Sequence, residues 1–213
     1  MNVLEQMSAV GIVPVIVVDD VAQAEKLADA LVAGGLPIAE ITFRTAAGAD
    51  AIRAISGRTD ILVGAGTVTT VAQVDAAVAA GAKYIVSPGT SRAVVERALE
   101  KGVMALPGAV TATEIQAALD LGVTTVKFFP AGTSGGAAAI KALAAPFGGV
   151  GFVPTGGVSL ANLAEYLSIP AVRAVGGSWM VKPELIRAGA WDELTGLAKA
   201  AVAAAADIRA AKA

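Results

Sequence analysis

Neither cysteine nor histidine occurs among the 213 residues of the sequence. Without cysteine the chain can form no disulfide, thiolate nucleophile or thiolate-bound metal. Without histidine it lacks the commonest general base and the commonest ligand of catalytic zinc. A magnesium site made only of carboxylates stays possible, but no tight group of Asp and Glu supports one, and we expect no metal and no other cofactor. The chemistry must therefore come from Lys, Arg, Asp, Glu, Tyr, Ser, Thr or backbone groups.

Charge and long apolar runs are also scarce. The formal net charge is −2 and the isoelectric point is about 5.2, so no basic field is present to attract nucleic acid. Hydrophobic residues make up 55% of the chain, but apolar runs such as residues 11–18 are far shorter than the roughly 20 residues of a membrane-spanning helix. Residues 1–10 do not read as a signal peptide. We expect a soluble, cytoplasmic protein that binds neither nucleic acid nor a membrane.

A strand-like run followed by an alanine-rich helical stretch recurs along the whole chain, as in repeated βα units. The eight runs span residues 12–18, 38–43, 61–66, 84–87, 103–107, 124–129, 151–154 and 172–175. Helical stretches between them include residues 21–33, 71–80, 92–101 and 113–121, with N-cap candidates at Asp19 or Asp20, Thr70, Ser91 and Thr111. Glycines follow these helices at 34–35, 81, 102 and 122. The pattern predicts an α/β protein in which residues 1–213 form a single (β/α)8 TIM barrel with a short N-terminal helix.

An open, doubly wound sheet is the competing architecture. It would usually carry a glycine-rich turn after the first strand, where this chain has residues 18–21, Val-Asp-Asp-Val. Pro14 and Pro154 fall inside predicted strands, and a closed barrel has no edge for a residue without an N–H. We expect both prolines at strand ends or irregular positions. Residues 191–213 are dominated by alanine and read as a terminal helix.

The sixth predicted strand contains a lysine between apolar residues. If Val126 and Phe128 face the outer helices, then alternation turns Thr125, Lys127 and Phe129 into the barrel. An ammonium in such surroundings is poorly solvated, which favours the neutral, nucleophilic amine that a Schiff base requires. A structural lysine paired with a carboxylate is the alternative.

The second predicted strand adds more inward-facing charge. By the same alternation Glu40, Thr42 and Arg44 share the inner face, and Ile41 and Phe43 pack outward. Glu40 is a candidate general acid/base within reach of the lysine, and the guanidinium of Arg44 suits a substrate carboxylate. An internal ion pair that only fills the barrel stays open.

Paired glycines end the seventh and eighth predicted strands. Thr155, Gly156 and Gly157 follow one of them, and Gly177 and Ser178 follow the other. Backbone N–H groups can approach an anion closely at glycine, and barrels commonly bind phosphate after strands 7 and 8. These residues therefore predict a phosphate site. At the end of the third strand, Thr67 either binds substrate or caps the next helix.

Together these motifs resemble a known family, the 2-keto-3-deoxy-6-phosphogluconate aldolases, which also includes 4-hydroxy-2-oxoglutarate and 6-phosphogalactonate-type aldolases. The resemblance extends in order over nearly the whole chain. It is carried by residues 40–45 (EITFRT), 64–68 (GAGTV), 87–89 (SPG), 127–131 (KFFPA), 154–157 (PTGG) and 176–179 (GGSW). We see no departure from the family at these motif positions.

The resemblance implies a role for each matching residue. It makes Lys127 the Schiff-base lysine and Glu40 the general acid/base. The residues that it assigns to the pyruvyl group are Arg44, Thr67, Pro88 and Phe129. Those that it assigns to the phosphate are Thr155, Gly156, Gly157, Gly177 and Ser178. It further implies a metal-free homotrimer that cleaves a phosphorylated 2-oxo acid and releases pyruvate, with the choice between gluconate and galactonate stereochemistry open.

Two other functions remain as alternatives. A phosphosugar isomerase or epimerase on the same barrel would use Glu40 as a base and form no adduct on Lys127. A non-enzymatic barrel, which forms a trimer or binds phosphate, would keep the inward charges for structure alone. It would lose much stability when one of the two charges is removed, because the other is left unpaired.

Overall fold

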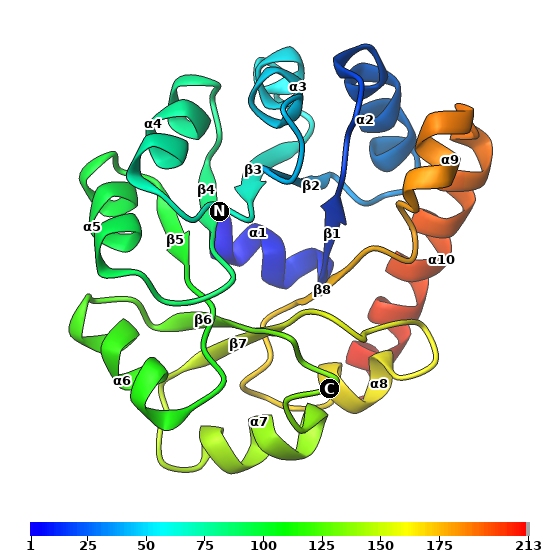
Figure 1. The fold of residues 1–213 in the computed structure, drawn as a ribbon. Coiled ribbons are helices and arrows are strands. Elements are labelled where there is room, and N and C mark those ends of the chain that lie inside the picture. The colour runs from blue at the N-terminus through cyan, green and yellow to red at the C-terminus, as the bar shows by residue number, and fades with distance from the viewer. Residues whose placement is uncertain (212–213) are drawn as a thin grey trace.

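Eight short parallel strands form a ring that is surrounded by helices (Figure 1). The computed structural model describes residues 1–211. The strands are β1 (Ile12–Ile16), β2 (Ile38–Thr42), β3 (Leu62–Gly66), β4 (Tyr84–Val86), β5 (Met104–Leu106), β6 (Thr125–Phe128), β7 (Gly151–Pro154) and β8 (Val175–Gly177). The helices are α1 (Val3–Val10), the 3-10 helix η1 (Val21–Gln23), α2 (Ala24–Ala33), α3 (Gly48–Ile55), α4 (Val71–Ala79), α5 (Arg92–Glu100), α6 (Ala112–Asp120), α7 (Gly136–Ala144), α8 (Leu163–Leu167), α9 (Pro183–Ala188) and α10 (Trp191–Ala210).

The strands close into a barrel. Six of them form one continuous sheet in the order β5-β4-β3-β2-β1-β8, and β6 pairs with β7. Parallel bridges join the two sheets, one between Gly108 and Lys127 and two others linking Phe152 to Val172 and Thr155 to Gly176. The predicted barrel is therefore confirmed, and the open doubly wound sheet is wrong.

The eighth strand was placed too early in the prediction. Residue Val172 makes only an isolated bridge to Phe152, and β8 begins at Val175 and continues through Gly176 and Gly177. Glycine is depleted in strands, and for this reason the sequence pattern ends the strand before Gly176 and Gly177. The structure gives the reason for glycine at Gly177: a Cβ there would lie 1.8 Å from the Trp179 ring.

The two strand prolines behave differently. Pro154 ends β7, as expected. The expectation for Pro14 is wrong, because it lies in the middle of β1 opposite Gly177. Residues 12–14 pair with β8, and residues 15–16 pair with β2. Pro14, which has no N–H, is therefore the last residue of β1 that pairs with β8.

Helix ends follow the sequence signals closely. Thr70 and Thr111 accept hydrogen bonds from the first turns of α4 and α6, whereas Ser91 precedes α5 without capping it. Four of the predicted glycine stops, at residues 35, 81, 102 and 122, have positive φ angles. The predicted terminal helix is observed as α10, and residues 212 and 213 lie outside the described part of the chain. None of the helices in residues 1–211 is long and apolar enough to cross a bilayer.

The core has two parts, as alternation along the strands requires. Outward-facing residues such as Ile41, Val126 and Phe128 join the helices in the main core. A smaller cluster fills the barrel interior and contains Met7, Val13, Ile38, Leu62, Tyr84, Val86, Leu106, Val153 and Ala174. Its members include the first residues of β2, β3 and β4.

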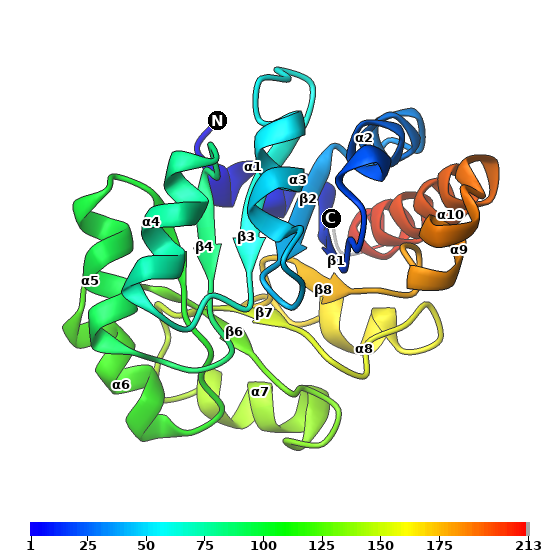
Figure 2. The ribbon, with the colours of Figure 1, turned by 45° about the horizontal axis from the view of Figure 1, so that its top comes forward.

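Helix α1 closes one end of the barrel. It crosses the ring of strands in Figure 1 and lies at one end of the barrel in Figure 2. Met7 is fully buried among the interior residues at the amino ends of the strands. Because this end is covered, the carboxyl ends of the strands form the open mouth, where TIM barrels place their active sites.

Candidate active site

A lysine and a glutamate face each other inside the barrel. Lys127 Nζ on β6 lies 3.3 Å from Glu40 Oε1 on β2, and the two side chains are only 4% and 3% exposed. The predicted inward orientation of both residues is therefore correct. A cation and a carboxylate at this distance can exchange a proton directly.

The barrel wall is shaped to hold the Glu40 carboxylate. Gly66 on β3 faces it, and a Cβ at Gly66 would lie 2.4 Å from Glu40 Oε1. Below it, the Tyr84 ring fills the space beside Gly64, and the Tyr84 hydroxyl donates to the Ala39 carbonyl oxygen at 2.9 Å. Burial raises the pKa of Tyr84, and the charge of Glu40 raises it further, so the phenol stays neutral. The neutral Tyr84 side chain thus packs beneath Lys127 and Glu40.

Phe129 connects the buried pair to the open mouth. Its ring centroid lies 5.2 Å from Lys127 Nζ, within the range of a cation–π interaction. Phe129 also lines the cavity above the pair. A ligand in that cavity would therefore contact the same aromatic ring as the lysine.

Arg44 and Thr67 meet at the carboxyl ends of β2 and β3. Arg44 Nε donates to Thr67 Oγ1 at 3.2 Å, and Arg44 is otherwise exposed. Within residues 1–211, Thr67 is the only non-glycine residue with a positive φ, at 57°. It does not cap the following helix, because Thr70 does so. The capping interpretation of Thr67 is therefore wrong, and its strained backbone is typical of functional positions.

A cavity of about 270 Å³ lies at the open mouth beside the glycine pairs. It is lined by Val15, Arg44, Phe129, Thr155, Gly156, Gly157, Val158, Gly177 and Ser178. The lining contains no acidic side chain and includes one cation, Arg44. In the described part of the chain, the N–H groups of Gly157 and Val158 donate no hydrogen bond. Free backbone donors and a guanidinium, in a lining without acidic side chains, make a site that suits an anion.

Most predicted site residues therefore come together at one mouth of the barrel, and Pro88 is the exception. Lys127, Glu40 and Thr67 do not line the cavity, but Lys127 contacts Glu40 and Phe129, and Thr67 bonds Arg44. Pro88 lies in the loop after β4 and neither lines the cavity nor makes such a contact. Its carbonyl group packs closely against Gly108, where a Cβ would lie 2.0 Å from the Pro88 oxygen.

Sequence reasoning missed three residues of the site. Val15 lines the cavity, and alternation along β1 could have identified it as inward-facing. Tyr84 fills the barrel beneath Glu40, and its position as the first residue of a predicted strand gave a weak signal. Val158 also lines the cavity, and nothing in its local sequence singles it out.

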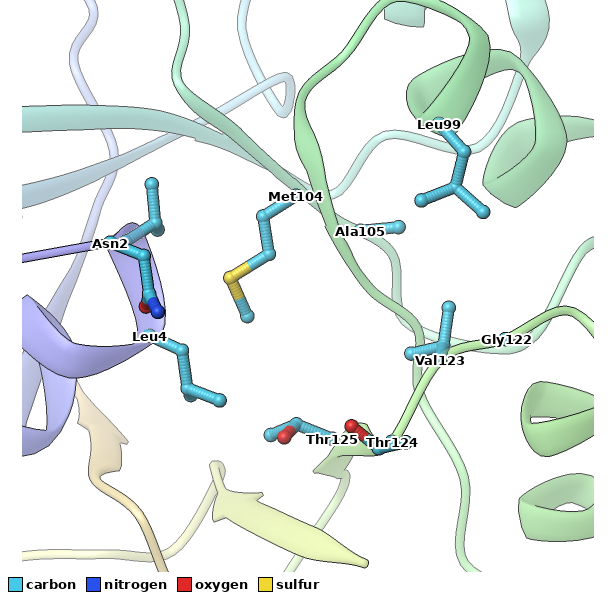
Figure 3. Close-up of a pocket in the computed structure, with 10 residues that line it drawn as sticks. Asn2, Leu4, Leu99, Met104, Ala105, Gly122, Val123, Thr124 and Thr125 are labelled. Carbon is cyan, nitrogen blue, oxygen red and sulfur yellow. The ribbon is translucent and has the colours of Figure 1, made fainter.

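A second cavity, of about 330 Å³, lies at the opposite end of the molecule (Figure 3). It is bounded by α1, β5 and the start of β6, with Leu4, Met104 and Val123 among the side chains that line it. None of its lining residues carries an ionisable side chain. This cavity therefore offers no acid, base or nucleophile, and the site with Lys127 is the candidate for catalysis.

Comparison with known proteins agrees with this geometry. The family model described as "KDPG and KHG aldolase" matches residues 3–197. The chain belongs to this family. A 2-dehydro-3-deoxy-phosphogluconate aldolase of Treponema pallidum is 48% identical over 199 residues, which cover 93% of this chain and 95% of the relative. A KHG/KDPG aldolase of Escherichia coli is 43% identical over 192 residues and 90% of each chain.

The fold of this chain is also found in a solved structure of the same family. The KDPG aldolase of Legionella pneumophila, captured with pyruvate as a covalent carbinolamine intermediate, matches with a TM-score of 0.89 and 38% identity. The match covers 93% of this chain and 97% of the Legionella chain. The resemblance inferred from the motifs is therefore confirmed.

Proposed function

We propose that this chain is a class I aldolase, a carbon–carbon lyase, that cleaves 2-dehydro-3-deoxy-6-phosphogluconate to pyruvate and glyceraldehyde 3-phosphate. The observation that carries the proposal is the Lys127–Glu40 pair, 3.3 Å apart and buried inside the barrel of an aldolase family member. A nucleophile beside a group that can accept and return protons is what imine chemistry requires. The names of the T. pallidum and E. coli relatives support the same substrate class.

The reaction begins with imine formation. The neutral amine of Lys127 attacks the C2 carbonyl of the substrate, and the C2–O double bond opens to give a carbinolamine. Two protons reach the C2 oxygen through Glu40, the first taken from the Lys127 ammonium before attack and the second from the nitrogen of the carbinolamine, so that the oxygen departs as water and a protonated imine remains. The covalent carbinolamine described for the Legionella relative corresponds to the first of these states.

Cleavage of the carbon–carbon bond follows from the imine. Glu40 removes the proton of the C4 hydroxyl, and the electrons of the C3–C4 bond move to the imine nitrogen to give an enamine. Glyceraldehyde 3-phosphate leaves as the C4 oxygen becomes a carbonyl. The enamine is protonated at C3, and water hydrolyses the imine to release pyruvate and restore Lys127.

The remaining residues orient the two charged ends of the substrate. Arg44, held by Thr67, would bind the carboxylate with its planar guanidinium. The ring of Phe129 would cover the pyruvyl group beside the lysine. Pro88 stays a proposal from the family motif alone.

The second charged end is the phosphate. The residues that we assign to it are Thr155, Gly156, Gly157, Gly177 and Ser178, all of which line the cavity. These donors favour phosphorylated substrates. The second substrate that we propose is the unphosphorylated 4-hydroxy-2-oxoglutarate, because the name of the E. coli relative includes a second activity besides KDPG cleavage. The C4 epimer, 2-dehydro-3-deoxy-6-phosphogalactonate, is the alternative phosphorylated substrate.

We also propose that the protein acts in the cytoplasm as a homotrimer. This rests on the resemblance of the motifs to the aldolase family. Light scattering coupled to size-exclusion chromatography tests it, because a trimer has three times the 21.0 kDa mass of the chain.

Reductive trapping tests the central proposal. The protein is incubated with pyruvate and borohydride, and the adduct is located by peptide mass spectrometry. We expect a reduced pyruvyl adduct on the Lys127 peptide, its loss in Lys127→Ala, and its retention in Lys83→Ala, which removes an exposed lysine. A folded wild-type protein without an adduct would overturn the aldolase proposal and favour an isomerase that uses Glu40 as a base.

A further inference from the structure

The side chain of Asn162 is bonded to the glycine turn after β7. Its Nδ2 donates to the Gly157 carbonyl oxygen at 2.8 Å, and its Oδ1 accepts from the Ser159 N–H at 2.8 Å. Asn162 is the N-cap residue of α8, yet its side chain makes no hydrogen bond to that helix. Asparagine at this position normally caps its own helix. Here both ends of the Asn162 amide bond the loop after β7 instead of α8.

The glycine turn has three consecutive carbonyl groups that are held from outside it. The Thr155 and Gly156 oxygens accept from Ala131 N at 2.8 Å and Gly132 N at 2.9 Å, and the Gly157 oxygen accepts from Asn162. In a planar trans peptide the N–H of the next residue points opposite to the carbonyl. Each of these bonds therefore also sets the direction of the following N–H.

The N–H groups that these bonds direct belong to three residues of the cavity wall. Fixing the carbonyls of residues 155, 156 and 157 fixes the N–H groups of Gly156, Gly157 and Val158. All three residues line the cavity, and within residues 1–211 the N–H groups of Gly157 and Val158 donate no hydrogen bond. Gly156 directly follows the parallel bridge that joins Thr155 to Gly176 of β8. The turn thus presents two free donors, at Gly157 and Val158, on a backbone that would otherwise be flexible, since Gly156 and Gly157 both have positive φ angles, at 88° and 80°.

The direction of the Val158 N–H depends on a side chain, whereas that of the Gly157 N–H depends on the backbone of the loop after β6. We infer that Asn162 is a positioning residue that holds the Gly157–Val158 peptide for the phosphate, and so sets the preference for phosphorylated over unphosphorylated substrates. The inference rests on the aldolase function proposed above. It extends the phosphate site to a residue that does not line the cavity.

The test compares Asn162→Ala with the wild type on two substrates that differ only in the phosphate. These are 2-dehydro-3-deoxy-6-phosphogluconate and 2-dehydro-3-deoxygluconate. We expect kcat/KM for the phosphorylated substrate to fall about tenfold, mainly through KM, because one oriented donor to a charged group is lost. For the unphosphorylated substrate, and for the rate of borohydride trapping of pyruvate at Lys127, we expect a change of less than about twofold.

Asn2→Ala is the matched control. Asn2 also bonds a backbone N–H through its side-chain oxygen, that of Glu5 at 2.9 Å, but it caps α1 at the opposite end of the barrel. This variant should lose stability without changing the ratio of the two kcat/KM values. Asn162→Ser keeps a good N-cap residue with a side chain too short to span the loop, and serves if the alanine variant does not fold.

The outcomes for the role of Asn162 and for the aldolase function can be told apart. A selective loss for the phosphorylated substrate, with weaker competitive inhibition by inorganic phosphate, supports the inference. An equal loss for both substrates, or no loss for either, overturns it. Absence of a trapped adduct in the wild type would be a different result, because it would refute the aldolase function and not the role of Asn162.

Discussion

Gly66 faces the Glu40 carboxylate from the neighbouring strand, and Gly66→Ala places a methyl group in the space that the carboxylate occupies. The added Cβ would lie 2.4 Å from Glu40 Oε1 and 2.8 Å from its Cγ. Gly66 belongs to β3 and is paired in register with Thr42, so the backbone is held in place. The Glu40 side chain must therefore move away.

The required movement can be estimated from ordinary contact distances. Non-bonded heavy atoms rest at about 3.5–4.0 Å, so the carboxylate must shift by about 1 Å. Misplacement of a reacting group by about 1 Å can cost about 10²-fold in rate. This corresponds to about 2.7 kcal/mol of transition-state stabilisation. We expect kcat of Gly66→Ala to fall about 10²-fold, although both charged residues are still present.

A double-mutant cycle tests whether the methyl group acts through Glu40. Glu40→Asp retracts the carboxylate from Lys127 and also vacates the space beside residue 66. If the methyl group acts only by displacing Glu40, Gly66→Ala should cost Glu40→Asp little further activity. The control is Gly57→Ala, because a Cβ at Gly57 meets no atom within 4 Å. Thermal unfolding of each variant checks that the barrel is intact.

Two results would refute this reasoning. The first is a Gly66→Ala enzyme whose kcat is within about threefold of the wild type, which would mean that the carboxylate position is not critical. The second is a double variant in which the two losses multiply, because independent effects would show that the methyl group does not act on Glu40.

Two further predictions concern stability. Arg209→Met removes a guanidinium that donates from α10 to the carbonyl oxygens of Ser8, Ala9 and Arg173; we expect a loss of about 1 kcal/mol and a Tm about 2–4 °C lower by calorimetry, and an unchanged Tm would show that these bonds are replaced by water. Burial raises the pKa of Glu114, but the hydrogen bonds that its carboxylate accepts from Val110 and Thr111 outweigh this effect and hold the pKa below its usual value. The wild type should therefore lose stability as the pH falls from about 4.3, the ordinary glutamate value, through the lower folded-state pKa. Glu114→Gln should be less stable than the wild type at pH 7, and the difference in their unfolding free energies should shrink towards pH 3. A difference that does not change with pH would contradict the lowered pKa of Glu114.

Alternation along strands was enough to predict the buried pair. A charged residue is costly inside a barrel, so Lys127 and Glu40 were conspicuous in otherwise apolar strands, and a period of two fixed the face on which they lie. The observed distance between them, 3.3 Å, did not follow from the pattern. It depends on the register between strands that are far apart in sequence.

Features that depend on complementary shapes could not be predicted. Gly64 and Tyr84 fit together in the barrel interior, and the sequence does not show that a small residue on one strand makes room for a ring on the next. The same holds for Gly177 and Trp179, and it is the reason that β8 was placed too early. The role of Asn162 was hidden because asparagine before a helix normally indicates only a cap.

The layers of the barrel explain how a charged pair can persist in its interior. The barrel interior beneath the pair is filled by apolar side chains and the neutral Tyr84, and the amino end is covered by α1, which carries Met7. Burying two charges costs more than their attraction returns in many proteins, and hydrophobic residues of similar size are often more stable. A pair with side-chain exposures of only 4% and 3% is therefore poorly explained by stability. Its presence beneath the cavity lined by free backbone donors and Arg44 is explained by the proton transfers that imine chemistry needs.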